Sequence, residues 1–291
     1  MSEGIAYSKI LKATGWMVGA IVSFTSMAIS GREINFAHDT FEIMLFRSLL
    51  GLLIMSAVLS AGSRWAEVRT ANFKLNALRN VCHFIGQNLW FFAVPLIPLA
   101  QLFALEFTTP IWVLLLSPLL LKERLTKLNV LTALLGFIGI LMVAQPGTSP
   151  ISFALIAGAS CAIFFALTAI FTRKLTQDHS IACILFYLTA MQAVFGFVCV
   201  IYDGAIAWPT SETLPWLIII GIAGLMAHFC LTNALALAPA TIIMPLDFVR
   251  LPVIAIIGML FYSEPFSALI IGGAVLIFAA NYINITFSRA K

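Results

Sequence analysis

Four ionisable residues lie inside long apolar stretches of the sequence, where a charge is costly. Glu106 follows "LFAL" and precedes a threonine pair, Asp247 and Arg250 lie three residues apart in "MPLDFVRLPV", and Arg47 lies in "IMLFRSLLGLL". A charged side chain surrounded by lipid costs several kcal/mol, so such residues usually face a cavity, a partner charge or a transport pathway. Their chemistry is therefore that of ion pairing, ligand binding or proton transfer within a membrane.

The spacing predicts two acid–base pairs. Glu106 is about 10 Å, and Arg47 about 9 Å, along the axis of its own apolar stretch, counting 1.5 Å per residue from the same membrane side. We therefore expect these two to lie at equal depth and to form an ion pair. Asp247 and Arg250 are at i and i+3 and can pair within one helix. Each pair is either a structural salt bridge or part of a substrate or proton site.

A second polar layer is predicted on two other stretches. His83, Gln87 and Trp90 follow the i, i+4, i+7 spacing of one helical face, and His228 and Asn233 occur in "HFCLTNALAL". A polar face on a membrane helix turns toward a cavity or toward another helix, because lipid leaves its donors unpaired. The stripe is therefore either a cavity wall or a set of hydrogen bonds between helices.

Two prolines and two tryptophans complete the candidate site. Pro110 leaves the carbonyl of Glu106 without its helical donor, and Pro252 does the same for Phe248. Interrupted helices of this kind supply binding groups and hinges in transporters, so both prolines are candidate hinges. Trp90 and Trp112 are candidate walls for a flat or cationic ligand, although aromatic side chains also pack or anchor at interfaces.

The composition indicates the elements that must hold these residues. Of 291 residues, 62% are hydrophobic and 10% are charged, whereas soluble domains carry about 25% charged residues. A helical crossing needs roughly 20 apolar residues. Runs of this kind occur at 13–30, 41–60, 77–95, 99–121, 128–146, 151–171, 181–202, 215–235, 240–262 and 266–287. We therefore predict an all-α integral membrane protein with ten transmembrane helices.

The two halves of the sequence are similar when the chain is aligned with itself at one constant shift in residue number. This offset places Arg32 on Arg173, Gln87 on His228, Pro98 on Pro239, Glu106 on Asp247 and Glu123 on Glu264. Five crossings per copy make the second copy inverted, so 1–147 and 148–291 are predicted to be two inverted five-helix repeats. Inverted repeats are typical of secondary transporters that work by alternating access. No catalytic motif or nucleotide-binding loop is recognisable, so we expect neither an enzyme nor an ATP-driven pump.

The motifs "FRSLLGLL", "FFAVPLIPLA", "NALALAPA", "KERL" and "SEPF" resemble the EamA-type branch of the drug/metabolite transporter superfamily. The resemblance implies a small-molecule carrier of the cytoplasmic (inner) membrane. We expect efflux of an amino acid or related metabolite. The alternatives are an importer of a vitamin or nucleoside-type metabolite, such as riboflavin or S-adenosylmethionine, and a non-transporting scaffold. The expected partners are the substrate, the lipid bilayer and possible coupling protons, without cofactor, metal or nucleic acid, in a monomer or homodimer.

The basic residues predict the orientation. With the N-terminus inside, 13 of the 16 Lys and Arg residues fall in inner segments and Arg32 alone falls in an outer one. Positive charge marks the cytoplasmic side, so both termini are expected to be cytoplasmic. In a variant without native cysteines, a cysteine introduced near position 207 should react with an impermeant reagent on intact cells, and one near position 68 should not. The reverse labelling pattern would contradict this topology.

Overall fold

The computed structural model of the chain describes residues 2–34, 36–122, 125–144, 152–204, 206–262 and 268–287, and these ranges contain helices but no strands. The longer helices are α1 (Ser2–Ile34), α2 (Thr40–Ala61), α3 (Phe73–Ala93), α6 (Lys127–Ala144), α7 (Phe153–Leu175), α8 (Ile181–Asp203), α9 (Leu214–Leu237) and α12 (Ala268–Phe287). A short 3₁₀ turn, η1 (Trp65–Glu67), links α2 to α3. Glu123 and Glu264 lie outside the described residues.

Two of the ten predicted crossings are broken. The fourth is divided into α4 (Leu99–Glu106) and α5 (Thr109–Leu120). The ninth consists of α10 (Ala240–Ile243), the 3₁₀ segment η2 (Met244–Val249) and α11 (Arg250–Tyr262). Within the described ranges, six helical segments are long and apolar enough to cross a membrane, and shorter apolar helices accompany them. The predicted all-α membrane fold is confirmed.

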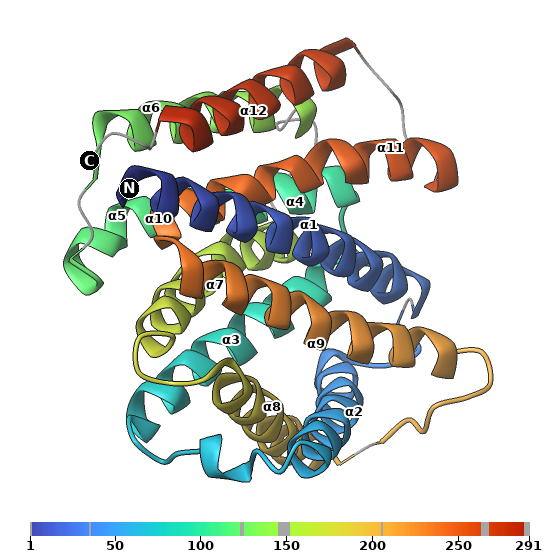
Figure 1. The fold of residues 1–291 in the computed structure, drawn as a ribbon. Coiled ribbons are helices and arrows are strands. Elements are labelled where there is room, and N and C mark those ends of the chain that lie inside the picture. The colour runs from blue at the N-terminus through green and yellow to red at the C-terminus, as the bar shows by residue number, and fades with distance from the viewer. Residues whose placement is uncertain are drawn as a thin grey trace.

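The packing of the helices follows the repeat. The offset that superposes Arg32 on Arg173 also relates α1 to α7, α2 to α8, α3 to α9 and α6 to α12. In the structure α2 packs on its equivalent α8, α6 packs on its equivalent α12, and the remaining helices pair crosswise, α1 with α9 and α3 with α7. Figure 1 shows the α6–α12 pair at one end of the bundle and the α2–α8 pair at the other. This pattern is unchanged when the two halves are exchanged, as an inverted repeat requires.

A pair of equivalent arginines caps the C-terminal end of the third helix in each half. Arg32, at the end of α1, donates from Nη1 to the carbonyls of Val94 and Ile97 at 3.4 and 3.2 Å. Arg173, near the end of α7, donates from Nη1 to the carbonyl of Leu235 at 2.6 Å. Val94 and Leu235 are themselves equivalent positions of the two repeats. Each arginine therefore pairs with carbonyls at the C-terminal end of the third helix of its repeat, where no helical N–H remains to satisfy them.

The breaks in the fourth and ninth crossings differ in their relation to proline. Pro110 is the second residue of α5, directly after the break, and the Thr109 hydroxyl donates to the Glu106 carbonyl at 2.5 Å. Thr109 thus replaces the donor that Pro110 lacks. Pro252 lies in the first turn of α11, where a missing N–H costs little. The break expected at Pro252 lies instead in η2, which begins at Met244 and contains Pro245.

The arginine caps give a test of the repeat. Arg173→Met should lower the free energy of unfolding by about 1–2 kcal/mol, since it removes charge-assisted hydrogen bonds to otherwise unsatisfied carbonyls. Arg32→Met, with longer hydrogen bonds, should have a smaller effect of the same sign. Thermal unfolding of the purified protein in detergent measures both. Arg64→Met serves as the control, because Arg64 forms an ion pair with the neighbouring surface residue Glu67 and its loss should change stability little. Equal effects at all three positions would contradict a specific role for the caps.

Candidate functional site

A cavity lies between the two halves of the protein. Its free volume is about 60 Å³, enough for several water molecules, so a larger ligand requires the cavity to widen. Both repeats line it. The first contributes Phe24, Met27, Arg79, His83, Gln87, Trp90, Glu106, Phe107, Thr109 and Pro110, and the second contributes Phe165, Thr168, Ala169, Thr172, His228, Leu231, Thr232, Met244, Asp247 and Arg250. Most of the predicted site residues therefore meet at one place.

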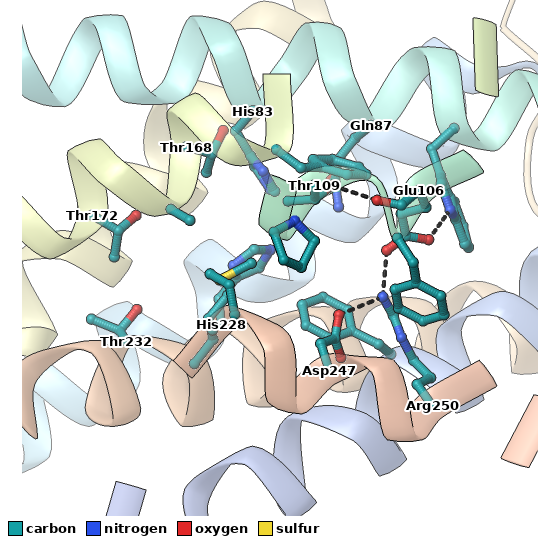
Figure 2. Close-up of a pocket in the computed structure, with 18 of the residues that line it drawn as sticks. His83, Gln87, Glu106, Thr109, Thr168, Thr172, His228, Thr232, Asp247 and Arg250 are labelled. Atoms are coloured by element: carbon teal, nitrogen blue, oxygen red, sulfur yellow. Dashed lines mark hydrogen bonds and ion pairs between the residues drawn. The ribbon is translucent and has the colours of Figure 1, made fainter. Parts of the chain in front are cut away.

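Three charged residues form a cluster at one end of the cavity (Figure 2). Arg250 donates to Oδ2 of Asp247 at 2.7 Å and also to Oε1 of Glu106. The indole Nε1 of Trp90 donates to the other Glu106 oxygen, Oε2, at 2.7 Å. The predicted Asp247–Arg250 pair is confirmed, and the cluster joins the broken fourth crossing to the broken ninth.

Aromatic rings surround the cation of this cluster. The guanidinium carbon of Arg250 is 4.9 Å from the ring centre of Phe24 and 5.0 Å from those of Phe103 and Phe107. A cation close to an aromatic face gains roughly 0.5–2 kcal/mol, the more so when water is excluded. The rings therefore hold the guanidinium in place while its hydrogen bonds go to the two carboxylates.

The predicted ion pair between Glu106 and Arg47 is wrong. Arg47 is buried in α2, where it donates to Sδ of Met44 at 3.7 Å, and it lines a separate small pocket. Its guanidinium packs directly against Gly224 in α9, where even a methyl group would collide with it. Equal depth in the membrane did not bring the two residues together, because α2 packs against α8 and α9 and away from α4.

Several polar atoms of the described residues that line the cavity have no hydrogen-bond partner. The rings of His83 and His228 meet edge to face, with centres 4.4 Å apart. Within the described part of the chain, both ring nitrogens of His83, Nε2 of His228, Oε1 of Gln87 and Oδ1 of Asp247 are buried without a hydrogen bond. Each such group costs about 1–3 kcal/mol if nothing pairs with it. The arrangement is therefore suited to a polar ligand or to bound water.

Arg79 is one of the 13 Lys and Arg residues predicted to lie in inner segments, but it lies in the cavity wall. Its side chain is 1% exposed, its Nε donates to the Thr172 hydroxyl at 3.0 Å, and its Nη1 donates to Oδ1 of Asn80 at 2.8 Å. A signal for this was present, because Arg79 is four residues before His83 and extends the His83–Gln87–Trp90 stripe by one turn. Even without Arg79, most Lys and Arg residues lie in the predicted inner segments.

Two predicted residues point elsewhere. Asn233 donates to the carbonyl of Phe229 in its own helix at 2.8 Å, and the preceding residue, Thr232, lines the cavity in its place. Trp112 is half-buried in α5 and packs against an apolar cluster that includes Val113 and Met244. Neither contributes to the cavity wall.

The cluster predicts an order of stability among its variants. Arg250→Met leaves two neighbouring buried carboxylates without a cation and should lower the free energy of unfolding by about 3–5 kcal/mol. Glu106→Gln should lower the free energy of unfolding less, because Asp247 and Arg250 remain as a pair of opposite charges. The double variant Glu106→Gln, Arg250→Met should be less destabilised than the sum of the two single changes. Thermal unfolding in detergent gives the order, and additive effects would show that the charges are not coupled.

Comparison with known proteins places the chain in a family. The chain is 28% identical over 243 residues to a riboflavin transporter of Brucella anthropi (82% of this chain, 86% of that one). It is 24% identical to an S-adenosylmethionine uptake transporter of Rickettsia felis (98% and 96%) and 28% identical to the pseudopaline exporter CntI of Pseudomonas aeruginosa (97% and 98%). A protein of known crystal structure shares the fold, with a TM-score of 0.76, 17% identity, and coverage of 93% of this chain and 95% of that one.

The family assignment rests on the whole length of the chain. The sequence profile of the EamA-like transporter family matches twice, over residues 11–145 and 152–286. The two matches cover the two repeats, α1–α6 and α7–α12, and exchanging these repeats leaves the helix packing pattern unchanged. The relatives named above are transporters of small molecules and not enzymes. The chain belongs to the EamA-like transporter family and is a multi-pass membrane transporter of small molecules.

Proposed function

We propose that the protein is a secondary carrier that moves a small metabolite across the cytoplasmic membrane by alternating access, with both termini in the cytoplasm. The observation that carries the proposal is the ion pair between Arg250 and Glu106, which joins the two halves at the cavity. Substrate sites in transporters built from inverted repeats lie between the repeats and use interrupted helices. The cavity has both properties.

The cluster offers a way to open the cavity without leaving a bare charge. Asp247 in η2 and Arg250 at the start of α11 are three residues apart and form an ion pair, so the two can stay together when Arg250 moves. When the halves separate, Arg250 can release Glu106 and keep Asp247 as its partner. Glu106 is then free to bind a cationic or hydrogen-bonding group of the substrate, or to take up a coupling proton. Loss of the link between the halves is thereby coupled to occupation of the site.

The named relatives include an uptake transporter and an exporter, so family membership is compatible with transport in either direction. Our working proposal is export of an amino-acid-type metabolite, with uptake of a vitamin or nucleoside-type metabolite as the alternative. Thermal stabilisation of the purified protein by amino acids, riboflavin and S-adenosylmethionine would rank candidates. Counterflow in proteoliposomes then tests each stabilising compound. Absence of counterflow for every compound of a broad metabolite panel would contradict the carrier.

Glu106→Gln separates the possible roles of the carboxylate, because it keeps the size of the side chain and removes its charge. If Glu106 carries a coupling proton, the variant should retain substrate counterflow and lose accumulation driven by a pH gradient. If Glu106 binds the substrate, counterflow should weaken as well, with KM raised about tenfold, as expected for loss of one charge-assisted hydrogen bond. Asn233→Ala, outside the cavity wall, is the matched control and should transport normally. Unchanged pH-driven uptake and KM in folded Glu106→Gln protein would assign the carboxylate a structural role only.

A further inference from the structure

The cavity has a second charged end, formed by Arg79. Arg79, Thr168 and Thr172 all line the cavity. In Figure 2 the two threonines lie at one end of the view, the Glu106–Asp247–Arg250 cluster lies at the other, and His83 and His228 lie between them. Because Arg79 donates to Thr172 at 3.0 Å, its guanidinium belongs to the threonine end.

Arg79 differs from Arg250 in having no acidic partner. Its two hydrogen bonds go to the Thr172 hydroxyl and the Asn80 amide oxygen, and among the described residues no carboxylate forms an ion pair with it. A guanidinium has five N–H donors, so its other nitrogen, Nη2, still has donors to offer. Burial of a cation without a counter-charge costs several kcal/mol. A structural role alone does not account for that cost, since a neutral donor would serve Thr172 as well.

We propose that Arg79 and Thr172 form an anion subsite of the cavity, which binds the carboxylate or phosphate group of an elongated substrate. This rests on the proposed carrier function and specifies the class of molecule carried. A guanidinium matches the planar geometry of such oxyanions and can donate two parallel hydrogen bonds to them. The Thr172 hydroxyl, which already accepts a hydrogen bond from Arg79, can donate its own proton to the same anion.

The spacing of the two charged ends along α3 indicates the size of the substrate. Trp90, which holds Glu106, is eleven residues after Arg79 in α3, or about 16 Å along the helix axis. A free α-amino acid carries its ammonium and carboxylate on one carbon and cannot contact both ends, so an amino-acid-type substrate of this site must carry its amine and its anion farther apart. The unpaired Oδ1 of Asp247 accepts a hydrogen bond from a cationic or donor group at the far end. The fitting ligand therefore has an anionic group and an amine or amide separated by a chain or ring system that passes the two histidines.

Matched probes of simple structure test the subsite directly. The probes are 8-aminooctanoate, its neutral analogue 8-aminooctanamide, and 6-aminohexyl phosphate, with glycine as the short zwitterion. Binding to the purified protein in nanodiscs is measured by calorimetry or thermal shift. We expect the wild-type protein to prefer 8-aminooctanoate or 6-aminohexyl phosphate over the amide by about tenfold, as one charge-assisted contact implies, and to bind glycine more weakly. The stronger of the two anionic probes distinguishes a carboxylate substrate from a phosphate substrate.

The variants assign the preference to Arg79. Arg79→Gln should abolish the preference for the anion while leaving the affinity for the amide unchanged, and Arg79→Lys should restore part of it. If Arg79→Gln does not fold, Thr172→Val takes its place in the test. Thr172→Val keeps the shape of the side chain and should weaken anion binding. Arg47→Gln is the matched control, because it removes another buried arginine that lies outside this cavity. It should keep the preference.

The outcomes separate the subsite from the carrier. Equal affinity of wild-type protein for acid and amide, failure of all the probes to bind, or an unchanged preference in folded Arg79→Gln protein would overturn the anion subsite. Counterflow by the wild-type protein with an unchanged KM in Arg79→Gln would overturn it while leaving the carrier function standing. Absence of counterflow for any metabolite would instead count against the carrier function, whatever the probes bind.

Discussion

The contact between Glu106 and Arg250 holds the two halves of the protein together at the cavity, and it is formed at two unfavourable helix ends. Glu106 is the last residue of α4 and Arg250 is the first residue of α11. The helix dipole disfavours an acid at a C-terminus and a base at an N-terminus. The two charges therefore depend on one another, and on Asp247 and Trp90, for their stability inside the membrane. A link that is favourable only as a pair is suited to the opening that the proposed carrier cycle requires.

The inverted repeat explains why two acids are present, and its imperfection explains why they share one base. Glu106 and Asp247 are equivalent by the offset that aligns Arg32 with Arg173, and the equivalent of Arg250 is Thr109. Thr109 does not neutralise a carboxylate; its hydroxyl donates to the backbone carbonyl of Glu106. In the proposed carrier cycle, the symmetry of the fold would allow two similar conformations, whereas the single shared cation makes the two halves chemically different. The proposed outward- and inward-facing states would therefore differ in their charge contacts.

The fold could be predicted from the sequence because its determinants are local. Apolar runs define the crossings. The repeat that aligns Arg32 with Arg173 is seen in the structure, where each of these arginines donates hydrogen bonds to equivalent backbone carbonyls. The partner of Glu106 could not be predicted in the same way. Residue counting gives the depth of a side chain in the membrane but not the direction in which it points, so Arg47 looked as suitable as Arg250. Arg79 was missed because its place near the start of a crossing resembled that of an ordinary cytoplasmic base.

The unpaired polar atoms of the cavity indicate how selectivity can arise without tight binding. Gln87 and His228 are equivalent residues of the two halves, and both present an unsatisfied atom beside His83. A molecule that supplies donors and acceptors at these positions relieves the cost of burying them, whereas a molecule of the same size without those groups leaves the cost in place. Rejection of the wrong molecule by unpaired buried groups is stronger than rejection by an apolar wall. Because the groups come from both halves, a ligand that satisfies all of them would stabilise the contact between the halves, which is the occluded state that the proposed carrier cycle requires.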